Sequence, residues 1–233
     1  EIFVNSKDPL IGKPISQGTV YEKNISNLFV KSLKQGMTLL DIGANIGWYS
    51  LLAAHSLQDN CNIYAFEPFS FNSKLILASN AINNFHSITV IQAAAGEETG
   101  TVGFGAAGSN GQCKEIPNEI MSILNSDTVN MIKIDDVINE KIDVIKIDIE
   151  GSEYEILDQL ISIQEKIQGI VIEFHNVTKN LDIIKEFLNK IGNNLNLVHI
   201  HANNYSIKEA NQFPEAIELT ISNIDLKNQD FDK

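Results

Sequence analysis

The chain has 233 residues, of which 43% are hydrophobic and 20% are charged, and its formal net charge is −13 at pH 7. This composition is typical of one folded globular domain and excludes a disordered chain. No apolar run approaches the roughly 20 residues that a membrane helix needs, and the acidic balance argues against nucleic acid or an anionic membrane as partner. Cys61 and Cys113 are the only cysteines, so we expect no disulfide framework and a reduced, cytoplasmic setting.

Strand and helix patterns alternate along the chain. A leading helix is predicted from Tyr21 to Lys34, and residues 1–36 form an amino-terminal segment ahead of a domain at 37–226 and a polar tail at 227–233. Thr38–Leu40 reads as a buried strand, and apolar residues at i, i+3, i+4 and i+7 from Trp48 predict a helix. Strands follow at 61–68, 88–96, 101–105, 143–151, 169–175, 196–204 and 216–222, with helices at 70–83, 152–160 and 181–191.

This alternation predicts an α/β fold with a mostly parallel sheet that is covered by helices on both faces. The last two strands follow each other without a crossover helix, so we expect the final strand to be antiparallel. Gly105–Asn118 is rich in Gly and Ser and is predicted to be an insertion over a site.

Three helix starts are predicted from their capping residues. Ser70 is expected to cap the helix at 70–83, and Ser152 with Glu155 three residues later has the spacing of a capping box. Asp135 and Asp136 are expected to cap a short helix at 135–140.

The segment "DIGANIG" lies where the first strand passes into its helix. A dinucleotide-binding loop has the pattern GxGxxG, but counting from Gly43 the third residue is Asn45 and the sixth is Trp48. The pyrophosphate of NAD would therefore meet side chains instead of bare backbone. We expect Gly43 and Gly47 to let the backbone approach a ligand closely, and the carboxylate of Asp41 suits a cationic ammonium group.

Glu67 points to a nucleoside ligand. It ends the second predicted strand, 20 residues beyond Gly47, where an acidic side chain accepts hydrogen bonds from ribose hydroxyls. A carboxylate for ribose, a carboxylate for an ammonium group and no phosphate cradle together describe S-adenosylmethionine.

The chain resembles the FkbM family of S-adenosylmethionine-dependent methyltransferases. The resemblance rests on "LLDIGANIGWYSLLAA", "IYAFEPFSFNSKLILASNAINN", "IKIDIEGSEYEIL" and "IVIEFH" in this order. It implies a Rossmann-like class I methyltransferase fold with seven strands, and O-methylation of sugars or sugar-bearing natural products. The cofactor-binding residues that it implies are Asp41, Gly43, Ala44, Asn45 and Gly47 on the methionine side, Glu67 at the ribose, and Pro68, Phe69, Ala93 and Ala94 around the adenine.

Removal of the hydroxyl proton needs a base or a metal beside the acceptor oxygen. Polar residues follow three successive core strands: Asp148 and Glu150, then Glu173 and His175, then His199, His201, Asn203 and Asn204. Because side chains alternate along a strand, Asp148 and Glu150 share a face with Lys146, and Glu173 shares a face with His175. His199 is predicted to be a core residue because its strand is apolar.

Two mechanisms remain open for these residues. In one, His175 with an ordinary pKa near 6.5 is the general base and Asp148 is a positioning carboxylate. In the other, a divalent cation such as magnesium or manganese lies between Asp148, Glu173 and His175 and lowers the pKa of the hydroxyl. Glu173 also has a purely structural alternative, paired with Lys146.

The predicted function is O-methylation of a sugar hydroxyl, with a small-molecule or glycan acceptor and no nucleic-acid partner. One alternative is a non-enzymatic methyltransferase-like module of a larger protein. Another is a nicotinamide-dependent oxidoreductase, which Asn45 and Trp48 disfavour. The sequence does not indicate an oligomeric state.

Overall fold

The computed structural model describes residues 1–107, 110–114, 127–192, 194–203 and 214–223. The predicted polar tail at 227–233 and Asn204 lie outside the described residues, as do residues 108–109 and 115–118 of the predicted insertion at Gly105–Asn118. The division of the chain at residues 36 and 226 stays a prediction.

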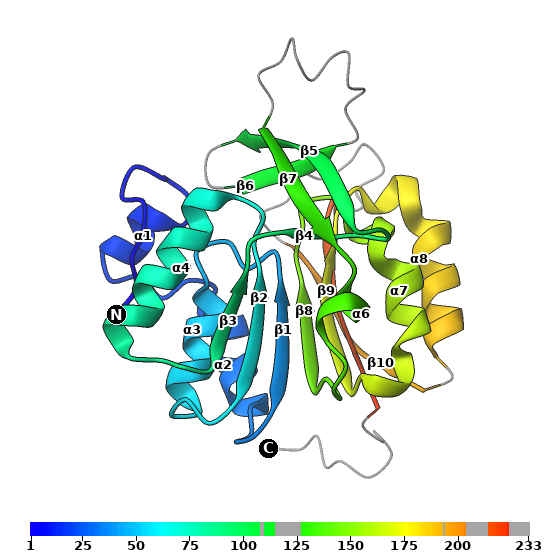
Figure 1. The fold of residues 1–233 in the computed structure, drawn as a ribbon. Coiled ribbons are helices and arrows are strands. Elements are labelled where there is room, and N and C mark those ends of the chain that lie inside the picture. The colour runs from blue at the N-terminus through cyan, green and yellow to red at the C-terminus, as the bar shows by residue number, and fades with distance from the viewer. Residues whose placement is uncertain (108–109, 115–126, 193, 204–213, 224–233) are drawn as a thin grey trace.

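A seven-stranded sheet forms the centre of the molecule (Figure 1). Its strand order is β10-β11-β9-β8-β1-β2-β3. Every neighbouring pair is parallel except the two that involve β11, which is antiparallel to both β9 and β10. The predicted α/β class and the antiparallel last strand are confirmed. The strands are β1 (Thr38–Ile42), β2 (Asn62–Phe66), β3 (Ile88–Ile91), β8 (Val144–Ile147), β9 (Gly169–Phe174), β10 (Asn196–Ala202) and β11 (Ile217–Ser222).

Helices cover both faces of this sheet (Figure 1). Elements α2, α3 and α4 pack on one face, and α6, α7 and α8 pack on the other. The helical elements are α1 (Gly12–Ser16), α2 (Lys23–Ser32), α3 (Trp48–Ser56), α4 (Ser70–Asn83), α6 (Ile134–Val137), α7 (Leu157–Ser162) and α8 (Val177–Ile191), with 3₁₀ turns η1 (Glu153–Ile156) and η2 (Gln164–Lys166).

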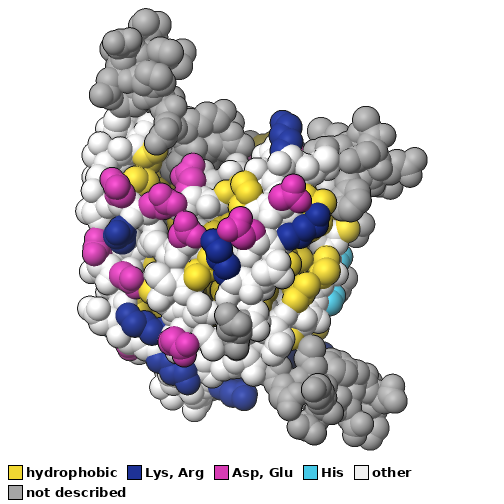
Figure 2. Space-filling model, turned by 90° about the vertical axis from the view of Figure 1, so that its right-hand side faces the viewer, with side chains coloured by type: hydrophobic (Ala, Val, Ile, Leu, Met, Phe, Trp, Pro, Cys, Tyr) yellow, Lys and Arg dark blue, Asp and Glu magenta, His cyan; other side chains and the backbone are white. Residues whose placement is uncertain are grey.

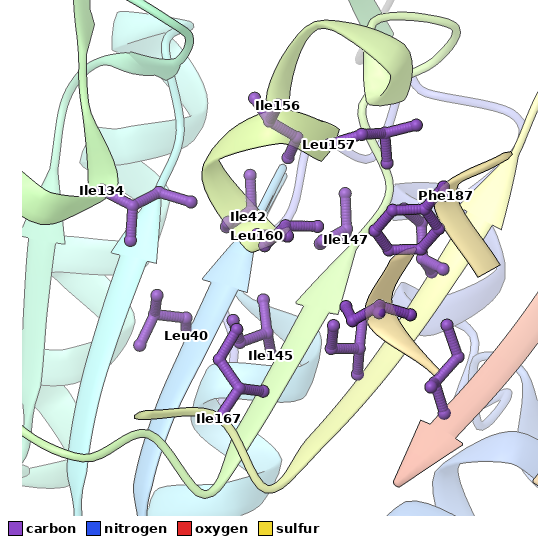
Figure 3. Packing of buried hydrophobic residues seen from close by; sticks show 14 of the residues in the cluster. Leu40, Ile42, Ile134, Ile145, Ile147, Ile156, Leu157, Leu160, Ile167 and Phe187 are labelled. Atoms are coloured by element: carbon purple, nitrogen blue, oxygen red, sulfur yellow. The ribbon is translucent and has the colours of Figure 1, made fainter. Parts of the chain in front are cut away.

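The alternation of side chains along the central strands divides the core into two layers. Leu40 and Ile42 of β1 pack with Ile145, Leu160 and Phe187 between the sheet and the helices α6, α7 and α8 (Figure 3). Residues at alternate positions, such as Leu39, belong to the layer under α3 and α4. Because β1 is buried on both faces, it reads as a continuous apolar run except at Asp41.

A second, four-stranded sheet departs from the predicted elements. Its order is β4-β7-β5-β6, with β4 (Ala94–Ala95), β5 (Gly100–Ala107), β6 (Asn110–Lys114) and β7 (Asp127–Ile132). The strand predicted at 88–96 is therefore two strands, because a tight turn with a hydrogen bond from Ala93 N to Ile91 O leads the chain out of the main sheet. Figure 1 shows the second sheet above one end of the main sheet.

The three predicted helix caps are wrong in detail. Ser70 is the first residue of α4, the N-cap is Phe69, and Ser73 Oγ instead donates to the carbonyl of Glu67. The predicted helix at 152–160 divides into η1 and α7, and Ser152 is the N-cap residue of η1 as predicted but makes no side-chain cap bond. The residues predicted to cap the short helix, Asp135 and Asp136, lie inside the first turn of α6.

None of the described helices is both long enough and apolar enough to cross a membrane. The face that carries α8 bears intermingled acidic and basic side chains (Figure 2). Two of its ion pairs, Lys185–Asp182 at 3.3 Å and Lys190–Glu186 at 2.9 Å, lie along α8 itself. The cytoplasmic location stays a prediction.

Candidate active site

An open pocket lies at the carboxyl ends of β1, β2 and β8. The empty space in the pocket, together with the solvent at its mouth, amounts to about 1020 Å³. Strand order reverses between β1 and β8, which is where ligands of open α/β sheets bind. Seven predicted cofactor residues line it: Gly43, Ala44, Asn45, Glu67, Pro68, Ala93 and Ala94. The other three, Asp41, Gly47 and Phe69, lie outside the lining.

The carboxylate of Glu67 is the buried acid of this pocket. Only 5% of the residue is exposed, and one carboxylate oxygen accepts a hydrogen bond from Asn45 N while the other accepts one from Phe69 N, both at 2.8 Å. Burial raises the pKa of Glu67 to about 8, against the opposing effect of these two bonds. The side chain of Asn72 also hydrogen-bonds to Glu67. Because a carboxylate can accept about four hydrogen bonds, Glu67 can still accept one from a ligand.

Gly43 and Gly47 are needed for the packing of the protein itself, and the expectation that they let the backbone approach a ligand stays a prediction. Both have φ of +81°, a conformation that favours glycine. A Cβ at Gly43 would overlap the carbonyl oxygen of Asp148, and a Cβ at Gly47 would lie 3.0 Å from the side chain of Ile76. The loop also contains Asn45 at φ +52°.

Asp41 points towards α3. Its Oδ2 accepts hydrogen bonds from the hydroxyl of Ser50 at 2.7 Å and from the backbone N–H of Ser50 at 3.2 Å, so it caps the first turn of α3 from the sheet. Among the described residues no donor reaches its buried Oδ1. Burial raises the pKa of Asp41, while Lys146 opposes this effect. The contact of Asp41 with a ligand ammonium group stays a prediction.

The predicted polar residues of β8 and β9 converge at one end of the pocket. Single ligand atoms of Asp148, Glu173 and His175 all lie within 4.8 Å of one another. Asp148 and Glu150 line the pocket, whereas Glu173 and His175 stand next to them outside the lining. Glu173 accepts a 2.6 Å hydrogen bond from Asn203. The ion pair of Lys146 is formed with Asp148, at 3.5 Å, and not with Glu173 as the structural alternative required.

His175 has a strongly perturbed environment. Its Nδ1 lies 2.9 Å from Glu153 Oε1, and its Nε2 lies 3.7 Å from Glu150 Oε2. Burial disfavours the imidazolium, but the hydrogen bond and charge of Glu153 outweigh burial and raise the pKa of His175 to about 9. The expectation of an ordinary pKa near 6.5 is therefore wrong. The pKa of Glu173 is raised as well, first by burial and then by the negative charge of Asp148.

Sequence reasoning assigned no role in the site to residues from several other parts of the chain. Tyr21 and Glu22 of the amino-terminal segment line the pocket, and the hydroxyl of Tyr49 donates a 2.5 Å hydrogen bond to Glu22. Met131 of β7 also lines the pocket. Glu153 belongs to the motif "IEGSEYEIL", but the spacing of that motif does not distinguish a contact with His175 from helix capping.

One predicted core residue is not in the core. His199 is exposed on β10, which is the edge strand of the main sheet. Its imidazole stacks on that of His201, with ring centroids 6.3 Å apart. An apolar run on an edge strand does not need two covered faces, which is why the apolar pattern was misleading here.

Comparisons with known proteins agree with this geometry. The model of the FkbM methyltransferase domain matches residues 41–206. A hexuronic acid methyltransferase, AglP of Haloferax volcanii, is 22% identical over 175 residues, which are 70% of this chain and 66% of that protein. The match thus covers slightly less than two thirds of that relative's length.

Two solved structures share the fold. A precorrin-6y C5,15-methyltransferase from Geobacter metallireducens has a TM-score of 0.51 and 14% identity, over 95% of this chain and 93% of that one. An rRNA methylase from Streptococcus thermophilus has a TM-score of 0.51 and 11% identity, over 92% and 99% respectively. At this identity the likeness concerns the Rossmann-like methyltransferase fold alone.

Proposed function

Because the chain belongs to the FkbM methyltransferase domain family, we propose that it transfers the methyl group of S-adenosylmethionine to a hydroxyl of a sugar or a sugar-bearing molecule. The family makes this a methyltransferase domain that uses S-adenosylmethionine. The observation that supports hydroxyl methylation is the cluster of Asp148, Glu173 and His175 at the end of the cofactor pocket. The sugar acceptor is supported by the likeness to a hexuronic acid methyltransferase.

The pocket residues fit S-adenosylmethionine. The carboxylate of Glu67 lines the pocket and has acceptor capacity left for a ribose hydroxyl. Ala93, Ala94 and Met131 provide a small, apolar wall for an adenine ring. Lys146 is the one Lys or Arg in the described lining, and its charge is balanced by Asp148, so this part of the pocket offers no phosphate cradle. When bound, the cofactor supplies an electrophilic methyl group on a sulfonium.

The acceptor hydroxyl must lose its proton as its oxygen attacks. We assign this proton to Nε2 of neutral His175, with Asp148 beside it to hold the hydroxyl in position. Because the pKa of His175 is about 9, only a few per cent of the histidines are neutral at about pH 7.5. Activity should therefore increase with pH.

A divalent cation is the second candidate mechanism. The three ligand atoms within 4.8 Å have a donor set of two carboxylates and one imidazole, which magnesium and manganese both accept. In that case removal of divalent ions with a chelator should abolish turnover, and added magnesium should restore it. Turnover that persists in the chelator assigns the proton transfer to the side chains alone.

The proposed function can be tested by binding and by methyl transfer. Isothermal titration calorimetry should detect S-adenosylhomocysteine, and radiolabelled S-adenosylmethionine should label neutral sugars, uronates or glycosylated metabolites in a panel. Asp148→Asn and His175→Ala should each remove turnover but keep cofactor binding, whereas Lys185→Gln on the distant helix α8 should change neither. A fully active His175→Ala variant would contradict the assignment of the base.

Two outcomes would favour other functions. Absence of S-adenosylhomocysteine binding would favour the non-enzymatic module, and a change in nicotinamide absorbance with substrate would favour an oxidoreductase. An RNA panel is needed as well, because one solved structure with this fold is an rRNA methylase. The net charge of −13 leads us to expect no labelling of RNA.

A further inference from the structure

Glu153 is a fully buried carboxylate that the proposed reaction does not use directly. Its side chain is 0% exposed, and it lies outside the pocket lining. Oε1 accepts backbone hydrogen bonds from Ile149 N at 3.2 Å and Gly151 N at 3.0 Å, and lies 2.9 Å from His175 Nδ1. Among the described residues no donor reaches Oε2. One oxygen of Glu153 therefore joins the end of β8 to the end of β9.

The turn that Glu153 holds is strained. Glu150 has φ of +56° and Gly151 has φ of +108°, and a non-glycine residue in the left-handed region costs of order 1–3 kcal/mol. Such residues persist only where their surroundings fix them. Here the turn places Glu150 on the pocket wall with its Oε2 3.7 Å from His175 Nε2.

The same motif also fixes the backbone of His175. The hydroxyl of Tyr154, next to Glu153 in the chain, donates a 2.5 Å hydrogen bond to the carbonyl of His175. Both the ring and the main chain of His175 are thus held by adjacent residues of η1. This arrangement leaves the imidazole little freedom to rotate.

We propose that Glu153 is a positioning residue that acts through His175. Because Oε1 of Glu153 acts as the acceptor of two backbone N–H groups, we infer that it also accepts from His175, so the proton of neutral His175 is on Nδ1. Nε2 is then the unprotonated nitrogen, 3.7 Å from Oε2 of the pocket residue Glu150. This inference rests on the proposed function. In the reaction the hydroxyl proton goes to Nε2, and the Nδ1 proton stays in its hydrogen bond to Glu153.

Two variants separate positioning from folding. In Glu153→Gln the amide oxygen must take the place of Oε1, because the two backbone N–H groups of Ile149 and Gly151 require an acceptor there. The tautomer is then kept but the negative charge that stabilises the imidazolium is lost. In Glu153→Met, of similar size, the acceptor itself is lost. Asp158→Asn, which removes an exposed carboxylate of α7, is the matched control.

At about pH 10, where His175 is neutral in every variant, we expect kcat to fall about 10- to 100-fold in Glu153→Gln, and further in Glu153→Met. The Kd for S-adenosylhomocysteine and the KM for the acceptor should change less than about twofold. Asp158→Asn should match the unchanged protein in every constant. An equal fall in kcat and in cofactor affinity, or a kcat per folded molecule that does not change, would overturn the positioning role.

A spectroscopic measurement does not depend on activity or on the folding of a variant. Long-range ¹H–¹⁵N correlation spectra at about pH 10, where His175 is neutral, distinguish protonated from unprotonated ring nitrogens; His175→Gln identifies its signals among the five histidines. Protonated Nδ1 supports the proposal, and protonated Nε2 overturns it. If no sugar is methylated, the proposed function fails, while this measurement still decides the role of Glu153.

Discussion

Replacement of Glu67 by Gln should make the unliganded protein more stable at high pH and lower its affinity for the cofactor. The carboxylate is 5% exposed, and its folded-state pKa of about 8 lies well above its ordinary value of 4.5. The native protein therefore keeps this proton to higher pH than the unfolded chain does. The contribution of protonated Glu67 to the free energy of unfolding is complete below pH 4.5 and is lost as the pH rises through about 8.

The magnitude follows from the width of this pH window. The window spans 3.5 pH units, and each unit is worth about 1.36 kcal/mol, so ionisation of Glu67 costs about 5 kcal/mol above pH 8. Gln cannot ionise and avoids this cost. Its amide group, however, places an N–H donor opposite one of the N–H groups of Asn45 and Phe69, which costs about 1–3 kcal/mol at every pH.

The two effects predict a change of sign. At pH 5 Glu67→Gln should be less stable than the unchanged protein by about 1–3 kcal/mol, and at pH 8.5 it should be more stable by about 2–4 kcal/mol. Urea denaturation without nucleoside measures this difference, and Glu97→Gln, which removes an exposed carboxylate, is the control. A difference between Glu67→Gln and the unchanged protein that stays the same across pH would refute the reasoning.

Binding should change in the opposite direction. Hydrogen bonds to a charged acceptor contribute about 1.5–3 kcal/mol, so the loss of charge at Glu67 should raise the Kd for S-adenosylhomocysteine at least about tenfold at pH 8.5. Calorimetry measures this directly. A variant that gains stability and loses affinity shows that this buried acid is kept for function at the expense of stability.

Three further predictions concern the loop, the capped helix and the base. Gly43→Ala places a Cβ on the carbonyl oxygen of Asp148, just after β8, and should cost about 3 kcal/mol or more in urea denaturation, whereas Gly100→Ala has open space and should cost under about 1 kcal/mol. Ser50→Ala should cost about 1–3 kcal/mol by removing a hydrogen bond to Asp41, with the Kd for S-adenosylhomocysteine unchanged; a large rise in Kd would instead tie Asp41 to the ligand. In a pH–rate profile, kcat should rise about tenfold per pH unit up to about pH 9, because only neutral His175 accepts the proton, and a flat profile from pH 6 to 9 would contradict this.

The main sheet was predictable because strands that are buried on both faces are runs of mostly apolar residues in the sequence. Strands such as Thr38–Ile42 and Gly169–Phe174 are apolar at nearly every position that faces a helix layer. Strands β4 and β7 of the second sheet have no such apolar runs. β4 has only two residues, and β7 contains Asp127, Thr128 and Asn130, so neither reaches the length or the apolar periodicity on which strand prediction depends.

The convergence of Asp148, Glu173 and His175 was predictable for a topological reason. Parallel neighbouring strands end at the same edge of a sheet, so polar residues that follow them must meet there. The pKa of His175 was not predictable in the same way. It depends on Glu153, which lies 22 residues away in the sequence and reaches the imidazole only because the turn at Glu150 and Gly151 folds η1 back over β9.

The glycine loop shows why a motif can identify a family without fixing the role of each residue. A positive φ and a missing Cβ are equally compatible with a bound ligand and with a neighbouring strand, and the letters "DIGANIG" do not distinguish the two. In the folded chain Gly43 makes room for β8 and Gly47 makes room for α4. The loop is therefore required for the fold, whereas the proposed contact with the ribose depends on Glu67. A homologue that keeps the loop but replaces Glu67 should fold in the same way and bind the cofactor poorly.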